Sequence, residues 1–136
     1  MSWRRLAIRV YYEDTDFSGL VYHASYLRFM ERGRTELLRE LGLAQRALVE
    51  QGALFFVVRA MEIDFRKPAI MDDLLTVETA IARVGGASIG MDQKVLRDGE
   101  LLASAKVTVA AVEGGRARRL PAQIREKFEK ILVTKP

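Results

Sequence analysis

Acidic residues and a single histidine gather in one short segment of the chain. Glu13, Asp14 and Asp16 are followed by Gly19 and by His23, just before a stretch with helical spacing. Acidic residues ahead of a helix can cap its free N–H groups and favour its dipole. The same arrangement can do chemistry, because a carboxylate can activate water or attack a carbonyl while the helix N–H groups stabilise the oxyanion. The spacing alone leaves both interpretations open.

The elements on either side of this segment have clear periodicity. Leu6, Ile8, Val10 and Tyr12 alternate with other residues, which predicts a half-buried strand to about Glu13.

A long helix is predicted next along the chain. Tyr26, Met30, Leu37 and Leu41 recur at helical spacing, and Gly42 follows as a stop signal. Gly33 lies near the middle of this helix, which we interpret as a packing device that lets the helix approach a sheet closely.

The hydrophobic pattern in the second half of the chain predicts mainly strands. A short helical turn over Gln45 to Glu50 precedes a period of two that continues to Val109, and Asp98-Gly99 is a tight-hairpin signal. Pro121 opens a short amphipathic helix. The last three long strands therefore form an antiparallel meander, and the order predicts an α+β fold in which a curled sheet wraps the long helix. An unprotected sheet edge favours a homodimer or larger homo-oligomer.

Composition excludes several classes of protein. The 136 residues fit one domain spanning 1–136, and 49% hydrophobic against 29% charged residues is typical of a globular chain. With no cysteine and one histidine, we expect no disulfide, metal site or cofactor.

The N-terminal residues lack the apolar run of a signal peptide and no stretch is long enough to span a membrane, so we expect a cytoplasmic protein. The net charge of +4 suits an anionic partner, but aromatic residues are not interleaved with the basic clusters as nucleic-acid binding requires.

The central segment resembles a known family. The run from Val10 to Tyr26, continued by Phe29-Met-Glu-Arg-Gly-Arg-Thr-Glu, is similar to the hotdog-fold acyl-CoA thioesterases of the 4-hydroxybenzoyl-CoA thioesterase type, and most similar to the tol-pal-associated bacterial enzymes. The resemblance extends to Phe55-Phe-Val-Val-Arg and to Pro68-Ala-Ile-Met-Asp-Asp, so it covers nearly the whole chain.

This resemblance implies hydrolysis of acyl-CoA or acyl carrier protein thioesters. It assigns the catalytic carboxylate to Asp16, acting as nucleophile or as general base on water. It assigns the carbonyl-polarising donors to the backbone N–H groups at or near His23. The His23 side chain has either a direct role or a structural one.

Other residues receive roles around that centre. We interpret Gly19 as a turn residue near the acyl group, and Tyr22 and Tyr26 as pocket wall or helix packing. The resemblance implies that the apolar start of a strand, Phe56, Val57 and Val58, lines the acyl pocket across a subunit interface. The basic residue Arg59 follows directly and is also expected to bind substrate. The bulky Phe17 is expected to narrow the site.

Further charged residues have competing interpretations. Glu31 on the long helix is the rival carboxylate, for which an intrahelical or intersubunit ion pair is the plainer explanation. Glu13 and Asp14 are expected to hold the loop and cap the helix. Candidates for the coenzyme A phosphates are Arg59, Arg66, Lys67 and the cluster from Arg116 to Arg119.

Two other functions compete with hydrolysis. A hotdog hydratase or dehydratase acts on similar thioesters, but that class places its acidic residue along the helix or across the dimer. A non-catalytic acyl-thioester-binding or interaction module is the second alternative, because a fold does not determine a function.

Overall fold

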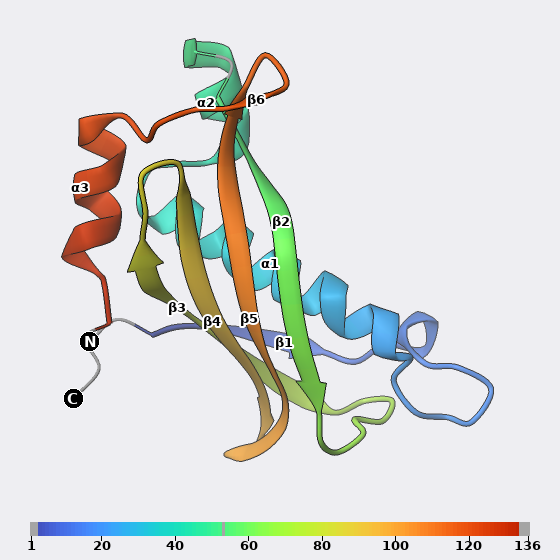
Figure 1. The fold of residues 1–136 in the computed structure, drawn as a ribbon. Coiled ribbons are helices and arrows are strands. Elements are labelled where there is room, and N and C mark those ends of the chain that lie inside the picture. Colours follow the sequence, from blue (N-terminus) through green and yellow to red (C-terminus); the bar gives the residue numbers. More distant parts are fainter. Residues whose placement is uncertain (1–2, 53, 134–136) are drawn as a thin grey trace.

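A curled antiparallel sheet with one long helix across its face dominates the computed structural model (Figure 1). The structure describes residues 3–52 and 54–133, so the outermost residues of the expected domain and residue 53 lie outside it. In chain order the elements are β1 (Arg4–Arg9), the 3₁₀ turn η1 (Tyr12–Asp14), α1 (His23–Glu40), α2 (Gln45–Gly52), β2 (Phe55–Phe65), β3 (Leu74–Val84), β4 (Ser88–Arg97), β5 (Glu100–Glu113), β6 (Arg116–Ala117) and α3 (Ala122–Lys130).

The strand order is β1-β3-β4-β5-β2, with β6 paired to β5, and every pair is antiparallel. The expected meander is therefore confirmed, and so is the α+β hotdog arrangement. The turn between β4 and β5 has φ +51° at Asp98 and +82° at Gly99, which matches the two-residue hairpin predicted from this dipeptide. Because β2 pairs only with β5, it forms one edge of the sheet in the part of the chain that the structure describes.

The core lies between α1 and the concave face of the sheet. Phe29, Met30 and Leu37 are fully buried on the inner side of α1. Gly33 lies between them, and a Cβ there would be 2.8 Å from both Thr79 Oγ1 and a Val77 methyl carbon. The interpretation of Gly33 as a device for close packing is confirmed.

The C-terminal helix closes one end of this core. Phe128 of α3 is fully buried and packs edge-to-face on Phe56, with ring centroids 5.8 Å apart. Beyond α3, the Val133 amide donates to the Ile81 carbonyl at 2.9 Å, which ties the chain to β3. Figure 1 shows α3 beside β3, away from the turn that precedes α1.

The end of the first strand differs from the sequence prediction. The first strand ends at Arg9 rather than near Glu13, and the chain then folds into the 3₁₀ turn. The reason is a side chain: the buried Asp14 carboxylate accepts the Tyr11 amide at 2.9 Å and bends the backbone away from strand geometry. The short strand β6 was not predicted, because two residues are too few for a periodic pattern.

No helix within residues 3–52 and 54–133 combines the length and the apolar character that crossing a membrane would need.

Candidate active site

Asp16 lies on a tight turn between η1 and α1. Thr15 and Val21 form an antiparallel bridge, and the Asp16 amide donates to the Leu20 carbonyl at 2.9 Å. Gly19 closes the turn with φ +84°, a conformation that a side chain would disfavour. Gly19 is thus the turn residue that the sequence predicts, and we call residues 15–21 the Asp16 turn.

The Asp16 carboxylate is exposed and held in its ionised form. Its Oδ1 accepts the Ser18 amide at 2.8 Å and the Ser18 hydroxyl at 2.5 Å. These two bonds, with a smaller electrostatic contribution from His23, lower the pKa of Asp16 below its ordinary value. Both bonds go to Oδ1, so Oδ2 is the oxygen without a hydrogen-bond partner in the described chain.

Asp14 has a structural role. Its Oδ2 accepts the Tyr11 amide, while its backbone carbonyl accepts the Tyr22 amide at 2.9 Å and the Ser25 hydroxyl at 3.1 Å. Arg28 lies 3.5 Å from Oδ1. The expectation that Asp14 holds the loop is confirmed, but the expectation that an acidic side chain caps α1 is wrong.

The first turn of α1 carries no side-chain cap among the residues that the structure describes. Tyr22 occupies the cap position, and the helix begins at the exposed His23. The first N–H groups of a helix have no partner within it. The backbone at His23 therefore offers donors, with the positive end of the helix dipole behind them.

The His23 ring is near Asp16 but does not hydrogen-bond to it within residues 3–52 and 54–133. It packs against two aromatic rings, with centroid distances of 4.6 Å to Tyr22 and 6.0 Å to Phe65. The direct and structural roles predicted for this side chain both remain predictions.

An open cleft of about 330 Å³ lies between the Asp16 turn, the start of α1 and the end of β2. Its lining consists of Asp16, Leu20, Val21, His23, Tyr26, Phe65, Arg66, Lys67 and Pro68. The structure therefore brings Asp16, His23 and Tyr26 together as the sequence predicts. Leu20, Val21, Phe65 and Pro68 were missed as lining residues, although the Pro68-Ala-Ile-Met-Asp-Asp motif was a signal that pointed to this segment.

Tyr26 forms the floor of the cleft and also packs the helix against its neighbours, so both predicted roles apply. It is 4% exposed, and its ring packs edge-to-face on Phe65 and Phe29. Its hydroxyl oxygen accepts the buried Ala69 amide at 2.9 Å. Burial raises the pKa of Tyr26, which keeps the hydroxyl neutral.

The predicted acyl-pocket residues of β2 lie at the other end of that strand. Phe56 is buried against α3, whereas Val57 and Arg59 are exposed, with Arg59 at a register shift in the pairing with β5. Phe56 and Val58 line a separate cavity of about 170 Å³. Within one copy of the chain, these residues do not line the Asp16 cleft.

Glu31 lies on the wall of that second cavity and not in the Asp16 cleft. Its carboxylate accepts a short hydrogen bond from the Thr35 hydroxyl. The intrahelical form of the predicted ion pair is wrong for the described residues, because the partner is this hydroxyl and not an arginine. The intersubunit form stays a prediction.

The basic candidates separate into two groups. Arg66 and Lys67 line the cleft, where they pair with Asp64 at 2.9 Å and Glu100 at 2.5 Å. The Arg116–Arg119 cluster follows the far end of β5, about 30 Å from the cleft at 3.3 Å per residue. Within one copy, Arg66 and Lys67 are the cations that can meet a ligand in the cleft.

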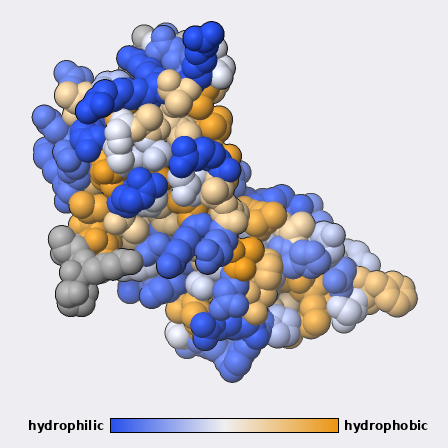
Figure 2. Space-filling view, viewed as in Figure 1, coloured by the Kyte–Doolittle hydropathy of each residue, from blue (hydrophilic) through white to orange (hydrophobic). Residues whose placement is uncertain are grey.

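Phe17 points away from the cleft. It is 108% exposed at the tip of the Asp16 turn, so the expectation that it narrows the site is wrong for a single copy. Figure 2 shows hydrophobic residues at the tip of the protruding end of the molecule, where Figure 1 places this turn.

No group of three histidine, cysteine, aspartate or glutamate residues within residues 3–52 and 54–133 is arranged to hold a metal ion. The polar groups of the cleft are instead a carboxylate, an imidazole, two cations and a helix start, a set suited to acid–base chemistry on a carbonyl.

Comparisons with known proteins point to one family. The sequence pattern of the thioesterase-like superfamily matches residues 10–130. An acyl-CoA thioesterase of Haemophilus influenzae, YbgC, is 46% identical over 123 residues, which cover 89% of this chain and 90% of that protein.

Solved structures agree with this match. A probable thioesterase from Bartonella henselae has 48% identity and a TM-score of 0.85, covering 88% of this chain and 100% of the other. A thioesterase from Thermus thermophilus, solved in complex with coenzyme A and zinc, has 30% identity and a TM-score of 0.81, covering 93% and 92%.

Proposed function

Because this chain belongs to the thioesterase-like superfamily and is an acyl-CoA thioesterase, we propose that the Asp16 carboxylate and the start of α1 carry out the hydrolysis. The observation that carries this proposal is the cleft in which an ionised, exposed carboxylate meets an uncapped helix start. The thioester carbonyl lies between them, with its carbon toward Asp16 and its oxygen toward the backbone N–H at His23.

Asp16 acts through its free oxygen, Oδ2. As a general base it takes a proton from water, and the resulting hydroxide adds to the carbonyl carbon. As a nucleophile it forms a mixed anhydride, which water then hydrolyses. In both cases the C–S bond breaks, and coenzyme A leaves as the thiolate and takes up a proton. Single-turnover hydrolysis in ¹⁸O-water tests for the second role: label in the Asp16 carboxylate requires an anhydride that water attacks at the aspartyl carbonyl carbon.

The helix start stabilises the charge that develops on the carbonyl oxygen. Loss of one such oxyanion donor typically costs about 2.7 to 4 kcal/mol of transition-state stabilisation. The His23 ring, which is exposed and lines the cleft, protonates the departing thiolate or orients the substrate.

The substrate is an acyl-CoA, and Arg66 and Lys67 at the cleft are the cations for its phosphates or pantetheine arm. A relative of this fold was solved with coenzyme A bound, which supports the assignment. An acyl carrier protein thioester presents the same pantetheine arm, and comparison of both substrates at equal concentration tests which is preferred. A coenzyme A substrate also fits the cytoplasmic location expected from the sequence.

The active assembly is a homodimer, or a homotetramer built from two such dimers. Support comes from the edge strand β2, where Phe55, Val57 and Val58 are 44%, 43% and 47% exposed. An unpaired edge with exposed apolar side chains is a liability that a second copy removes. Antiparallel pairing through β2 places the Phe55 end of one copy beside the Phe65 end of the other, which brings Phe56–Arg59 to the neighbouring cleft.

The test is thiol release from acyl-CoAs of varied chain length and one aromatic acyl-CoA. Asp16→Asn keeps the size of the side chain and removes its charge, so we expect kcat to fall by about 10²- to 10⁴-fold. Glu13→Gln is the matched control, because Glu13 is an exposed neighbouring carboxylate outside the cleft, and its kcat should equal that of the wild type.

Two results would redirect the assignment. Equal hydrolysis by wild type and Asp16→Asn would make Glu31 the next candidate. Acyl-CoA binding without hydrolysis by either protein would favour a non-catalytic binding module.

A further inference from the structure

The loop between β2 and β3 packs against the C-terminal end of the Asp16 turn. We call residues 66–73 the wall loop. The Val21 amide donates to the Ala69 carbonyl at 2.8 Å, and Leu20 forms an antiparallel bridge with Ile70. Ala69 is fully buried, and its own amide donates to Tyr26. The position of the Asp16 turn therefore depends on where the wall loop is held.

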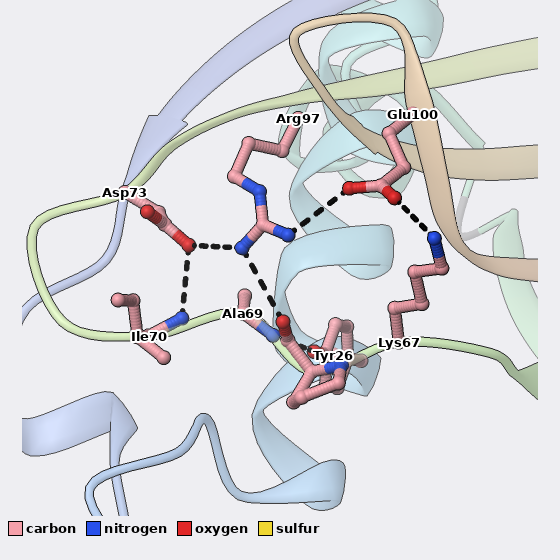
Figure 3. A network of polar contacts seen from close by, with 8 residues as sticks. Tyr26, Lys67, Ala69, Ile70, Asp73, Arg97 and Glu100 are labelled. Carbon is pink, nitrogen blue, oxygen red and sulfur yellow. Dashed lines mark hydrogen bonds and ion pairs between the residues drawn. The ribbon is translucent and has the colours of Figure 1, made fainter.

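Arg97, the last residue of β4, holds the wall loop from the opposite side (Figure 3). Its Nη1 donates to Asp73 Oδ2 at 2.8 Å and to the Pro68 carbonyl at 3.3 Å. The same Asp73 oxygen accepts the Ile70 amide at 2.9 Å. One guanidinium group thus connects both ends of the segment 68–73.

The charges of this cluster stabilise one another. Partial burial acts to raise the pKa of Asp73, but the hydrogen bonds from the Ile70 amide and from Arg97 outweigh it and lower that pKa. Asp73 is therefore ionised at neutral pH and remains a strong acceptor for Arg97.

A second series of hydrogen bonds connects Arg97, through Glu100, to Lys67 in the cleft. Its Nη2 donates to Glu100 Oε1 at 3.1 Å, and Glu100 Oε2 accepts Lys67 Nζ at 2.5 Å. Lys67 and Pro68 line the cleft together with Asp16 and His23. Figure 3 shows Arg97 between Asp73 and Glu100, with Lys67 beyond Glu100.

We propose that Arg97 is a positioning residue for thioester hydrolysis: by holding Asp73, the Pro68 carbonyl and Glu100, it sets the wall loop and, through Ala69 and Val21, the place of Asp16 opposite the start of α1. Arg97 does not line the cleft, so it acts through other residues. This inference rests on the proposed function.

A planar guanidinium is needed for this task because it reaches three acceptors in fixed directions, whereas a lysine ammonium has a single nitrogen. The ion pair between Arg5 and Glu78 offers a comparison, because its nitrogen–oxygen distance of 2.9 Å is close to the 2.8 Å between Arg97 and Asp73. The Arg5 side chain is 71% exposed and has one partner among the described residues, whereas that of Arg97 is 27% exposed. Arg5 is therefore a matched control for the loss of an arginine ion pair away from the cleft.

The experiment compares Arg97→Gln, Arg97→Lys and Arg5→Gln with wild type and Asp16→Asn. kcat and KM for an acyl-CoA are measured per folded molecule, with the folded fraction taken from thermal unfolding at the assay temperature. Misplacement of a catalytic group by about 1 Å can cost about 10²-fold in rate, so we expect Arg97→Gln to lower kcat at least about tenfold. KM should change less than kcat, because Arg97 does not line the cleft and Lys67 keeps its own hydrogen bond to Glu100.

Arg97→Lys should recover part of kcat through its remaining contact with Asp73, and Arg5→Gln should match the wild type. Amide hydrogen exchange provides a readout that does not depend on activity: exchange at Val21 and Ala69 should be faster in both Arg97 variants and unchanged in Arg5→Gln. If Arg97→Gln does not fold, Arg97→Lys is tested by the same two readouts.

The outcomes distinguish this inference from the proposed function. An active wild type, an impaired Asp16→Asn and a folded Arg97 variant with kcat within twofold of wild type would overturn the role of Arg97 alone. Unchanged exchange at Val21 and Ala69 would do the same. A wild type that hydrolyses no acyl-CoA would overturn the proposed function and this inference together.

Discussion

The middle and the start of α1 belong to one helix but have opposite environments. In the middle, Met30, Gly33 and Leu37 are buried against the sheet, and Gly33 leaves no room for a methyl group. At the start, His23 is exposed and faces a cleft beside the exposed Asp16. A helix that is anchored by its middle can keep its first turn open for a ligand. The residues that anchor the middle of α1 therefore differ from His23, which faces the cleft.

The same division separates two carboxylates in one short segment. Asp14 is 6% exposed and accepts the Tyr11 amide, whereas Asp16 is exposed and bonds only within its own turn among the described residues. The buried carboxylate shapes the backbone, and the exposed one is free to react. Residue type alone does not distinguish them.

The largest effect on stability should come from Gly33→Ala. The added methyl group meets Thr79 and Val77 at 2.8 Å, and such overpacking typically costs about 1 to 3 kcal/mol. The gain in helix propensity, about 1 kcal/mol, offsets only part of that cost. We expect a lower free energy of unfolding in urea and an unchanged kcat per folded molecule.

Gly52→Ala is the control for this substitution, because Gly52 also lies in a helix but a Cβ there meets nothing within 4 Å. It should be neutral or stabilising. A Gly33→Ala protein as stable as wild type would show that the middle of α1 is not closely packed.

Tyr26→Phe tests the boundary between the two regions, and its effect should be smaller. The change removes the acceptor of the buried Ala69 amide, and a buried donor left without a partner typically costs about 1 to 3 kcal/mol. We expect the free energy of unfolding to fall by about 1 kcal/mol and kcat to fall as well, because Tyr26 forms the cleft floor. Tyr12→Phe, at an 81% exposed tyrosine outside the cleft, should leave both quantities unchanged.

Ser18→Ala should have the smallest effect, visible in the pH dependence of kcat/KM. The Ser18 hydroxyl favours ionised Asp16, so its loss raises the pKa of Asp16 toward the ordinary value of about 3.9. In the proposed mechanism only the ionised form of Asp16 is active, so the acid limb of the profile should move to higher pH while the rate at neutral pH stays the same.

Thr15→Ala removes another hydroxyl of the same turn, one that donates to the Tyr12 carbonyl and not to Asp16. Its acid limb should coincide with that of the wild type. An unmoved limb in Ser18→Ala would indicate that a group other than Asp16 limits activity at low pH.

Much of the fold could be predicted because its signals are local. Helical spacing and the stop at Gly42 predict α1, and the positive φ of both Asp98 and Gly99 follows from turn chemistry. Gly33 could be interpreted as a packing device because glycine destabilises the interior of a helix relative to alanine, and close packing against a sheet offsets that cost. The end of β1 was misplaced because one buried side chain, Asp14, overrides the alternating pattern.

The candidate site divides in the same way. The sequence by itself determined that Asp16, Gly19 and His23, the centre of the candidate site, lie within one short segment between two predicted elements. Only the tertiary structure decided that Phe65, Lys67 and Pro68 form the opposite wall of the cleft, and that Arg97 and Asp73 hold that wall. The physical reason is range: periodicity and turn preferences act between near neighbours in the chain, whereas a cleft is made by contacts between distant segments that the sheet brings together.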